Sequence, residues 1–369
     1  MSSIRSKKLE TSADSLKTNR TSNGMKSITE AGNISGKKIL VRVDWSVPTQ
    51  GDKVIDDYQI KKSLPTIEYL QKAGAKIILI SHAEKDGDSL LSIFQHVKAY
   101  LPLLSFVEPS GLVLLENLRR NPGEKANSET YAKELALLGD VYVNEAFPES
   151  HREYASIVGV PKFLPSFAGL RFVEETQKLS SVFYPKRPFL FILGGAKFDT
   201  KLPLLKKFIH IADHIFVGGA LANNFFKEQG VDIGDSLVKE GGGFGLKELL
   251  KTGKIILPED TIIRDGKILD AGPRTIENLK PIISASKLVL WNGPLGGYEK
   301  GYKMATLALA KMISEFSSES IVGGGDTIAA IKELDLFDKF SFVSTGGGAM
   351  LDFLATGTLP GIEALNHQQ

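Results

Sequence analysis

The amino-acid sequence predicts an α/β fold with two doubly wound parallel sheets, one in each of two domains. Three observations favour this fold. The chain has 369 residues, which exceeds the usual size of a single hydrophobic core. Short apolar runs alternate with stretches of helical periodicity, as in repeated strand–helix units. This alternation stops near residue 166 and restarts near residue 189, so we expect a connecting helix and a cleft between the domains.

The first predicted domain covers residues 25–165 and follows a polar leader. Residues 1–24 are rich in Ser, Thr, Lys and Asn and poor in apolar residues, a composition typical of disorder. Within the domain, short apolar runs predict strands, and apolar residues at helical spacing predict helices. The expected strands are 38–43, 75–81, 112–116 and 140–143, and the expected helices are 59–73, 90–100 and 129–138.

The second predicted domain covers residues 185–355 and repeats the same alternation. Residues 166–184 have helical spacing with no strand beside them and are followed by Pro185 and Pro188, so this stretch is the expected connecting helix. The expected strands of the second domain are 189–193, 214–217, 254–257, 288–291, 320–322 and 340–343. Each of them ends in a small, polar or glycine-rich turn. Because ligands bind beyond the carboxyl ends of strands in open α/β sheets, these turns are the expected functional site.

Composition and charge exclude several classes of protein. Hydrophobic residues make up 42% of the chain and charged residues 24%, as in ordinary globular proteins. The formal net charge is only +2, which argues against a nucleic-acid partner. No apolar run approaches the length of a membrane span, and the absence of cysteine excludes disulfides and thiolate metal sites. We therefore expect a cytoplasmic protein without membrane or nucleic-acid partners.

The stretch SIVGGGDT at 320–327 is the strongest local signal for ligand binding. It reads as a strand end, a glycine turn and a helix over 328–334, with Asp326 and Thr327 at the N-cap. The free N–H groups and the positive end of the helix dipole suit a phosphate, and the Asp326 carboxylate could hold Mg²⁺ against it. Taken alone, the stretch fits an ordinary strand-to-helix turn with an Asp cap equally well.

Further glycine turns follow the neighbouring strands. In GGAKFDTK at 194–201, Lys197 and Lys201 could both reach a phosphate, although two lysines on a helix more often form a solvated face. WNGPLGGYE at 291–299 forms a rigid loop, and STGGGA at 344–349 repeats the strand–glycine–helix pattern. There is neither a Walker A sequence nor a full G-x-G-x-x-G. A P-loop NTPase and a standard dinucleotide fold are therefore both disfavoured.

These turns, together with VRVDWSVP at 41–48 and LENLR at 115–119, resemble the phosphoglycerate kinase family. The resemblance runs from about Met25 to Leu365 in the family's order, and WNGPLGGYE, VGGGDT and VSTGGGAMLDFL are its most specific segments. It implies two Rossmann-like domains and a reversible phosphoryl transfer between 1,3-bisphosphoglycerate and ADP, which gives 3-phosphoglycerate and ATP. It also implies a monomer and favours nucleotide phosphate over a simple helix cap at Asp326.

By that resemblance, the second domain binds MgADP or MgATP. The residues implied to bind the nucleotide are Lys201, Asn292, Glu299, Gly324, Gly325, Asp326 and Thr327, with Asp326 also holding Mg²⁺. The residues implied in catalysis are Lys197, Arg119, Arg152, Gly347 and Gly348. Positive charge and helix dipoles stabilise a transferring phosphoryl group in such chemistry, so no nucleophile–base pair is expected.

The first domain is implied to bind the acidic three-carbon substrate. The residues that match the family's substrate patch are Asp44, Trp45, Ser46, Gln59, His82, Lys85, Arg119 and Arg152. The resemblance also implies that LPGIEAL at 359–365 packs back onto the first domain, so that residues 356–369 complete it.

Departures from the family pattern cluster in this substrate half. Gln59 stands where the family has an arginine, Ser46 replaces an asparagine, and Lys85 replaces an arginine. Pro148 and Glu149 replace a glycine and a threonine. The segment 101–112 is shorter than usual and is expected to lack a helix.

Loss of the arginine at position 59 leaves two hypotheses open. A guanidinium grips a carboxylate or phosphate with two hydrogen bonds and a permanent charge, which the neutral Gln59 does not replace. Lys62, one turn further along, could compensate in part. The first hypothesis is a working kinase with a remodelled acid pocket. The alternative is a catalytically weakened or re-purposed nucleotide-binding paralogue.

Overall fold

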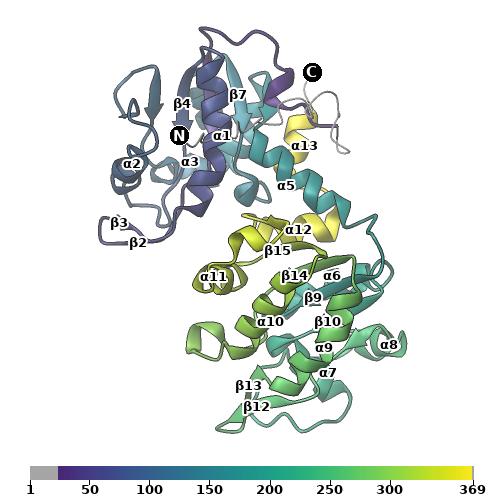
Figure 1. The fold of residues 1–369 in the computed structure, drawn as a ribbon. Coiled ribbons are helices and arrows are strands. Elements are labelled where there is room, and N and C mark those ends of the chain that lie inside the picture. Colours follow the sequence, from purple (N-terminus) through teal and green to yellow (C-terminus); the bar gives the residue numbers. More distant parts are fainter. Residues whose placement is uncertain (1–23, 368–369) are drawn as a thin grey trace, which may run out of the picture.

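The computed structural model describes residues 24–367, which fold into two lobes, one above the other in Figure 1. Residues 1–23 of the predicted leader lie outside the described residues. Each lobe is built on a sheet of six strands, and all strand pairs within these two sheets are parallel. The predicted fold class, two parallel-sheet α/β domains, is confirmed.

The first lobe carries a sheet with the strand order β5-β6-β4-β1-β7-β8. Its strands are β1 (Lys38–Arg42), β4 (Lys76–Ile80), β5 (Ser105–Phe106), β6 (Leu112–Leu114), β7 (Val141–Asn144) and β8 (Ser166–Ala168). The helices are α1 (Tyr58–Lys72), α2 (Leu91–Val97), α3 (Pro122–Lys125) and α4 (Glu129–Ala136). The apolar runs predicted β1, β4, β6 and β7, because a central parallel sheet is covered on both faces, whereas β5 and β8 were not predicted. Between Leu101 and Leu112 the structure has only β5, so the expected absence of a helix there is confirmed.

The second lobe carries a sheet with the strand order β11-β10-β9-β14-β15-β16. Its strands are β9 (Phe189–Leu193), β10 (His214–Val217), β11 (Ile255–Ile256), β14 (Leu288–Asn292), β15 (Glu319–Gly323) and β16 (Phe342–Val343). The helices are α6 (Phe198–Phe208), α7 (Gly219–Glu228), α8 (Leu246–Lys251), α9 (Pro273–Ala285), α10 (Met304–Glu315), α11 (Gly325–Glu333) and α12 (Gly348–Thr356). All five residues of the central strands β9 and β14 are buried, which explains their continuous apolar sequence.

Several parts of the fold differ from the sequence prediction, and the first is the connecting segment. Residues 166–184 do not form one helix, because β8 pairs with β7 at the edge of the first sheet and α5 (Leu170–Ser181) begins only after it. A strand of three residues is too short to show a period of two, so the helical spacing that follows obscured it.

The second difference is the antiparallel hairpin of β12 (Thr261–Arg264) and β13 (Lys267–Ala271). Its turn contains Asp265 and Gly266, whose φ angles are 51° and 69°. Asp-Gly between two apolar runs is a hairpin signal that would have revealed these strands. A smaller hairpin joins β2 (Thr49–Gln50) to β3 (Lys53–Val54).

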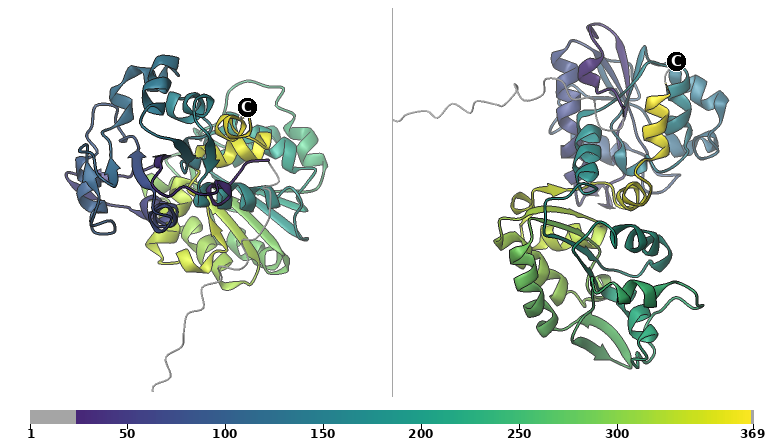
Figure 2. Two further views of the ribbon diagram at one scale, coloured as in Figure 1. Left: turned by 90° about the horizontal axis from the view of Figure 1, so that it is seen from above. Right: turned by 90° about the vertical axis from the view of Figure 1, so that its right-hand side faces the viewer.

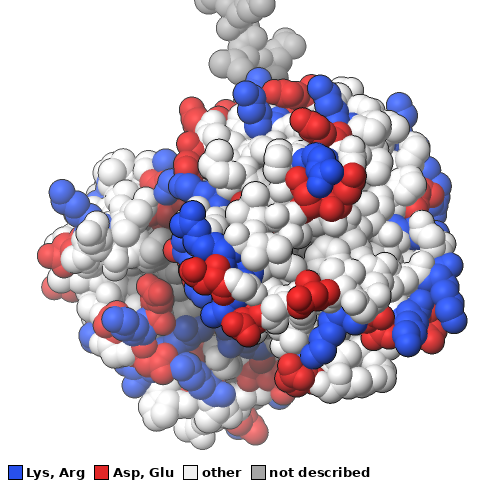
Figure 3. Space-filling model, turned by 90° about the horizontal axis from the view of Figure 1, so that it is seen from below, with Lys and Arg blue, Asp and Glu red and all other residues white. Residues whose placement is uncertain are grey.

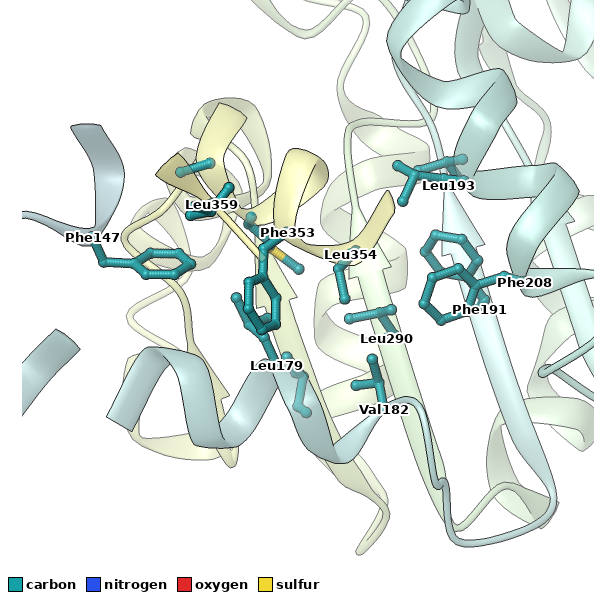
Figure 4. Close-up of a cluster of buried hydrophobic side chains, with 14 of the residues drawn as sticks. Phe147, Leu179, Val182, Phe191, Leu193, Phe208, Leu290, Phe353, Leu354 and Leu359 are labelled. Atoms are coloured by element: carbon teal, nitrogen blue, oxygen red, sulfur yellow. The ribbon is translucent and has the colours of Figure 1, made fainter. Parts of the chain in front are cut away.

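The two lobes share one continuous hydrophobic core, which extends across the boundary between them. Helix α5 runs from the upper lobe toward the lower one, and α13 (Pro360–Asn366) returns to lie on the upper lobe (Figures 1 and 2). Figure 4 shows Phe147 of the first lobe beside Phe353 of α12, and their ring centroids are 6.1 Å apart. A shared apolar core restricts how far the lobes can separate without exposing these rings.

The surface carries no extended field of one charge on the face seen in Figure 3, where basic and acidic side chains alternate. Among the described residues, no helix combines the length and the apolar character that a membrane crossing requires.

Candidate active site at the boundary between the lobes

The turn after β15 places a glycine, not Asp326, at the helix N-cap. Gly324 has a φ of 102°, and its carbonyl oxygen accepts the first helical hydrogen bond from the amide of Ile328. Helix α11 therefore begins at Gly325, and Asp326 lies in its first turn. The prediction that Asp326 caps the helix is wrong, because only glycine adopts the required backbone angle without strain. The Asp326 carboxylate is consequently free to point away from the helix backbone.

Lys201 lies buried between two glycine turns at the same edge of the sheet. Its Nζ donates a hydrogen bond to the carbonyl oxygen of Gly194. A Cβ added at Gly195 or at Gly293 would lie 2.7 Å from this Nζ, and the φ angles of 81° and 94° at these two positions strain any residue other than glycine. Burial, assisted by the charge of Lys197, lowers the pKa of Lys201 to about 8, although Asp326 opposes the shift.

Lys197, Glu299 and Asp326 complete the charged rim of this site. Lys197 is exposed at the N-cap of α6. Burial raises the pKa of Asp326, the nearby Glu299 carboxylate raises it further, and Lys201 lowers it. The structure therefore brings together acidic and basic residues that lie on three separate turns of the sequence.

Asn292 and Thr327 lie beneath the turns rather than in the open site. The Thr327 hydroxyl oxygen accepts a hydrogen bond of 2.9 Å from the amide of Gly293, and the Thr327 side chain is fully buried. The Asn292 amide is 3.8 Å from the sulfur of Met350 and lies against Gly324. Both residues hold the glycine turns in place. Their effect on a bound nucleotide would therefore be indirect, through the position of those turns.

A cavity of about 460 Å³ adjoins the glycine turns. Its walls come from the start of α7, from β13 and from the loop 294–300, and Glu299 and Asp326 lie at its rim. Phe226, Leu237, Leu269 and Leu295 give it an apolar surface that the motif analysis did not identify. A cavity of this size, with apolar walls and a charged mouth, suits a planar base attached to a phosphorylated sugar.

Arginine, histidine and glutamate converge in the first lobe. The Glu149 carboxylate accepts a hydrogen bond of 2.8 Å from the NH2 nitrogen of Arg119 and lies 3.3 Å from Nε of Arg152. The Nε2 of His82 is 3.5 Å from the same carboxylate and 3.9 Å from that of Asp44. The structure thus brings together Asp44, His82, Arg119 and Arg152, with Glu149 at their centre.

Ser46 and Trp45, two other residues of the predicted patch, both make hydrogen bonds within the first lobe. The Ser46 hydroxyl donates a hydrogen bond of 2.6 Å to Asp44 and fixes the direction of that carboxylate. Trp45 has no exposed side-chain surface, and its indole N–H donates a hydrogen bond of 2.9 Å to the Ser63 hydroxyl. The Trp45 ring therefore lies in the hydrophobic core of the first lobe, and its role in substrate binding stays a prediction.

Lys85 and Gln59 occupy the edges of the patch. Lys85 is exposed in the loop after β4, where the Asn117 amide donates to its backbone carbonyl. The Gln59 amide reaches the carbonyl oxygen of Thr345 in the second lobe, at 3.4 Å. Gln59 therefore spans the boundary between the lobes, where a family arginine was expected to reach substrate.

A buried arginine that the motif analysis missed supports His82 from below. Arg42 has no exposed surface, and its NH2 nitrogen lies 3.1 Å from Nδ1 of His82. Its Nε donates to the Ser156 hydroxyl at 2.9 Å, and Ser156 in turn donates to Glu124 at 2.5 Å. The basic residue on strand β1 was visible in the sequence, but an apolar run gave no reason to expect its partners.

The N-terminus of α12 meets the first-lobe patch. Gly347 precedes the helix with a φ of 47°, and a Cβ added at Gly348 would lie 3.6 Å from Nε2 of His151. A Cβ at Gly346 would lie 2.6 Å from the Phe147 ring, so this close approach requires glycine. Because His151 is the neighbour of Arg152, the arginine patch and the second-lobe helix terminus lie at the same boundary.

The fold and these two facing sites define a class of protein: a two-domain α/β phosphotransferase. Glycine turns at the carboxyl ends of parallel strands suit phosphate, and an arginine patch suits an acidic second substrate. The sequence model of the family "Phosphoglycerate kinase" matches residues 28–357. The chain belongs to the phosphoglycerate kinase family.

Individual relatives agree with this assignment. The phosphoglycerate kinase of Orientia tsutsugamushi (strain Ikeda) is 39% identical over 385 aligned positions, which cover 90% of this chain and 95% of that protein. That of Roseiflexus sp. (strain RS-1) is 36% identical and covers 90% of this chain and 97% of the relative. The predicted family, phosphoglycerate kinase function and phosphotransferase activity are confirmed at this level.

Solved structures show the same two-lobed fold. The phosphoglycerate kinase of Coxiella burnetii superposes with a TM-score of 0.79 at 31% identity, and covers 92% of this chain and 98% of its own. The enzyme of Pyrococcus horikoshii OT3 superposes with a TM-score of 0.81 at 27% identity, with the same coverage of both chains.

Proposed function

We propose that this chain catalyses reversible phosphoryl transfer between 1,3-bisphosphoglycerate and ADP, with 3-phosphoglycerate and ATP as the products. Besides the membership of the family, one structural observation supports this proposal. The N-terminus of α12 lies against His151, next to Arg152, so a phosphoryl group there would touch both lobes. The glycine turns of the second lobe and the arginines of the first would hold the two substrates on either side of it.

The nucleotide half would hold MgADP or MgATP in the cavity beside β13. Gly324, Gly325 and the backbone of α11 would contact the phosphates, with Lys201 supplying a buried positive charge and Glu299 lying within reach of the ribose. Asn292 and Thr327 would shape these turns from beneath.

Magnesium fits this site as a shared ligand of the protein and the nucleotide. Among the described residues, no group of three or more His, Asp or Glu side chains is arranged to hold a metal ion by itself. Asp326 supplies one carboxylate at the mouth of the cavity. Because Mg²⁺ commonly takes one or two carboxylates and completes its shell with phosphate and water, a single aspartate beside a nucleotide suffices. When bound, the ion would neutralise charge on the phosphates.

The acid half would hold 3-phosphoglycerate on the first lobe. Arg119 and Arg152 would bind its anionic groups, Lys85 would add charge at the exposed edge, and Asp44, Ser46 and His82 would orient the hydroxyl-bearing chain. Gln59 lies at the boundary between this patch and Thr345. Guanidinium groups suit carboxylate and phosphate because they donate two parallel hydrogen bonds.

The transfer itself would depend on positioning and on electrostatics. Lys197 and the N-terminus of α12, at Gly347 and Gly348, would stabilise the charge that develops on the phosphoryl group. Arg119 and Arg152 would do so from the substrate side. Closure of the lobes would exclude water, since an acyl phosphate hydrolyses when water reaches it.

The proposed domain division assigns residues 25–165 to a substrate domain and 185–355 to a nucleotide domain, joined through 166–184. Residues 356–369 would complete the first domain, and 1–24 would remain a leader. Supporting this division, α13 packs on η5 (Ala155–Gly159) and the Gly361 amide donates to the carbonyl oxygen of Ser150 at 2.9 Å. The protein is proposed to act as a cytoplasmic monomer with small-molecule substrates only.

A coupled assay of ATP formation from 1,3-bisphosphoglycerate and MgADP tests the proposed reaction. Turnover that depends on both substrates is the expected result. Binding of MgADP without any turnover would instead indicate the re-purposed paralogue, which none of these relatives supports. Loss of turnover in Lys197→Ala, with MgADP affinity kept, would place the defect in the transfer step rather than in nucleotide binding.

A further inference from the structure

A carboxylate of the chain itself already occupies the arginine patch. Glu149 is the last residue of η4 (Phe147–Glu149), and its side chain is only 9% exposed. One carboxylate oxygen faces His82, at 3.5 Å from its Nε2. The other accepts from Arg119 at 2.8 Å and lies 3.3 Å from Nε of Arg152. Glu149 thus makes with this patch the contacts that a bound carboxylate would make.

The two guanidinium groups form one anion-binding unit. The Cζ atoms of Arg119 and Arg152 lie 5.6 Å and 5.7 Å from the centroid of the Tyr154 ring, so both groups pack against the same aromatic side chain. Among the described residues, the buried Nε of Arg119 has no hydrogen-bond partner. A donor that is buried without an acceptor carries a free-energy cost, which a ligand oxygen would relieve.

The Glu149 carboxylate is charged at neutral pH. Burial alone would raise its pKa, but the hydrogen bond with His82 and the charges of His82, Arg42 and Arg119 outweigh burial and hold the pKa well below its usual value. The negative charge therefore offsets one of the two arginine charges. A substrate anion must either share the arginines with this carboxylate or displace it.

We propose that Glu149 is a specificity-determining residue that acts as a built-in counter-ion of the arginine patch and lowers its affinity for acidic substrates. The inference rests on the proposed function, since it takes Arg119 and Arg152 as the site of the acidic substrate. Glu149 would discriminate among ligands by their charge. A ligand with one anionic group at this site competes with Glu149 for the arginines. A ligand that also accepts a hydrogen bond from Nε of Arg119 gains a contact that Glu149 does not make.

The test compares steady-state kinetics of the full chain with those of Glu149→Gln and Glu149→Thr. Both substitutions remove the charge, and glutamine keeps the length of the side chain. The KM for 3-phosphoglycerate is expected to fall at least about tenfold, equivalent to about 1.4 kcal/mol, while the KM for MgATP stays unchanged. Glu153→Gln is the matched control. Glu153 is exposed and lies close to Glu149 in the sequence, and its substitution changes the net charge by the same amount. Its KM is expected to equal that of wild type.

The direction of the change separates this role from a structural one. If Glu149 only held the arginines in place, its removal would raise KM and lower the melting temperature, and either neutral variant with a raised KM overturns the proposal. An unchanged KM in both variants, with normal turnover, also overturns it and leaves the proposed function intact.

A calorimetric titration of the wild type covers the case in which the variants do not fold. With MgADP saturating, the Kd for 3-phosphoglycerate is expected above about 1 mM. A wild-type Kd below about 0.1 mM overturns the counter-ion role, since the patch would then bind an anion without hindrance. Absence of turnover in every form, together with no detectable 3-phosphoglycerate binding even in Glu149→Gln, would overturn the proposed function as well.

Discussion

Lys201 and Asp326 illustrate how single side chains acquire function from their surroundings. Lys201 is buried against two glycine turns, and Asp326 stands in the first turn of α11. A lysine with a buried ammonium and a partly buried aspartate of raised pKa are unfavourable for folding by themselves. A bound nucleotide phosphate and its cation would satisfy both groups, which is a physical reason for their position.

Replacing either side chain is expected to weaken nucleotide binding. Asp326→Ala and Lys201→Ala should each cost on the order of 2–3 kcal/mol in MgADP affinity, because a charge-assisted contact is lost. This corresponds to a roughly 30- to 150-fold higher Kd in a calorimetric titration. Glu315→Ala, at the far end of α10, serves as the control. Wild-type affinity in both test variants would contradict the placement of the nucleotide.

The lowered pKa of Lys201 also predicts how nucleotide binding depends on pH. Burial brings this pKa to about 8 in the free protein, whereas a bound phosphate favours the protonated form. Affinity for MgADP should therefore be fully developed below pH 8 and fall by up to about tenfold per pH unit above it. In Lys201→Met the Kd should be higher and nearly flat from about pH 7 to about pH 9. A wild-type profile equally flat would show that Lys201 does not meet the phosphate.

Gln59 is expected to limit how strongly the first lobe can assist phosphoryl transfer. Lys62 and Arg120 are the two basic residues that could take the place of the family arginine, and both already have a neighbour in the structure. Arg120 pairs with Glu116 at 3.1 Å, and Lys62 lies 5.2 Å above the centroid of the Tyr58 ring. We therefore expect wild-type activity to be low but measurable, with a guanidinium charge missing near Thr345.

Gln59→Arg is expected to raise kcat/KM by at least about tenfold, since a charge-assisted contact in the transition state commonly changes rates by about 10²-fold. The coupled assay measures the change, and an unaltered KM for MgADP serves as the internal control. If Gln59→Arg has no effect while Lys62→Ala or Arg120→Ala abolishes turnover, one of those two residues already takes the arginine's place.

At the scale of elements, the turn before α12 is held by a buried ion-pair network from α5. Glu175 has no exposed surface and accepts hydrogen bonds from the Ser344 hydroxyl at 2.7 Å and from the Thr345 amide at 2.7 Å. Arg171 donates to Glu175 at 2.8 Å and to the carbonyl oxygen of Val343 at 2.6 Å. Helix α5 thus positions the glycine turn that precedes the proposed transfer site.

Breaking this network should destabilise the fold and impair turnover together. Glu175→Ala removes the acceptor that the buried Arg171 guanidinium shares with the Ser344 hydroxyl and with the amide and hydroxyl of Thr345. Loss of one partner from a buried ion pair typically costs about 3–5 kcal/mol. The control is Glu174→Ala, because Glu174 is 50% exposed and pairs with the same arginine at 2.6 Å. Urea denaturation should show a large loss for the first variant and less than about 1 kcal/mol for the second. Equal losses in the free energy of unfolding would mean that Glu175 contributes no more to stability than the exposed Glu174.

At the scale of the whole molecule, the two chain ends are expected to differ in importance. Helix α13 buries Ile362 and Leu365, and Leu359 just before it is buried as well. Each fully buried aliphatic side chain contributes about 1.5–3 kcal/mol, so removing all three approaches the whole stability of a domain. Residues 1–24, by contrast, offer a polar composition with little to bury.

Deletion of residues 358–369 is therefore expected to lower the melting temperature steeply, whereas deletion of residues 1–24 should leave it and the MgADP affinity unchanged. Differential scanning calorimetry of the two truncated chains measures both effects side by side. A loss of several degrees on removal of 1–24 would show that the leader contributes to the fold. A C-terminal truncation as stable as wild type would show that α13 is dispensable.

The sequence alone predicted the two parallel sheets, the glycine turns at their strand ends and the family. These features are local: a buried strand needs a continuous apolar run, and a turn such as the one at Gly324 needs a residue without a Cβ. Sequence comparison also flagged Gln59 and Glu149 as departures. It did not show what these two residues contact.

Only the tertiary structure decided the partners. Arg119 and Glu149 are 30 residues apart in the chain, and no local pattern joins them. Trp45, next to a substrate-patch aspartate, turned out to lie in the core, and β8 exists only because it pairs with β7. Ion pairing and burial depend on distances that the folded chain creates. Whether a charged side chain of a motif is open to a ligand or is already paired within the chain is therefore set by its neighbours in space.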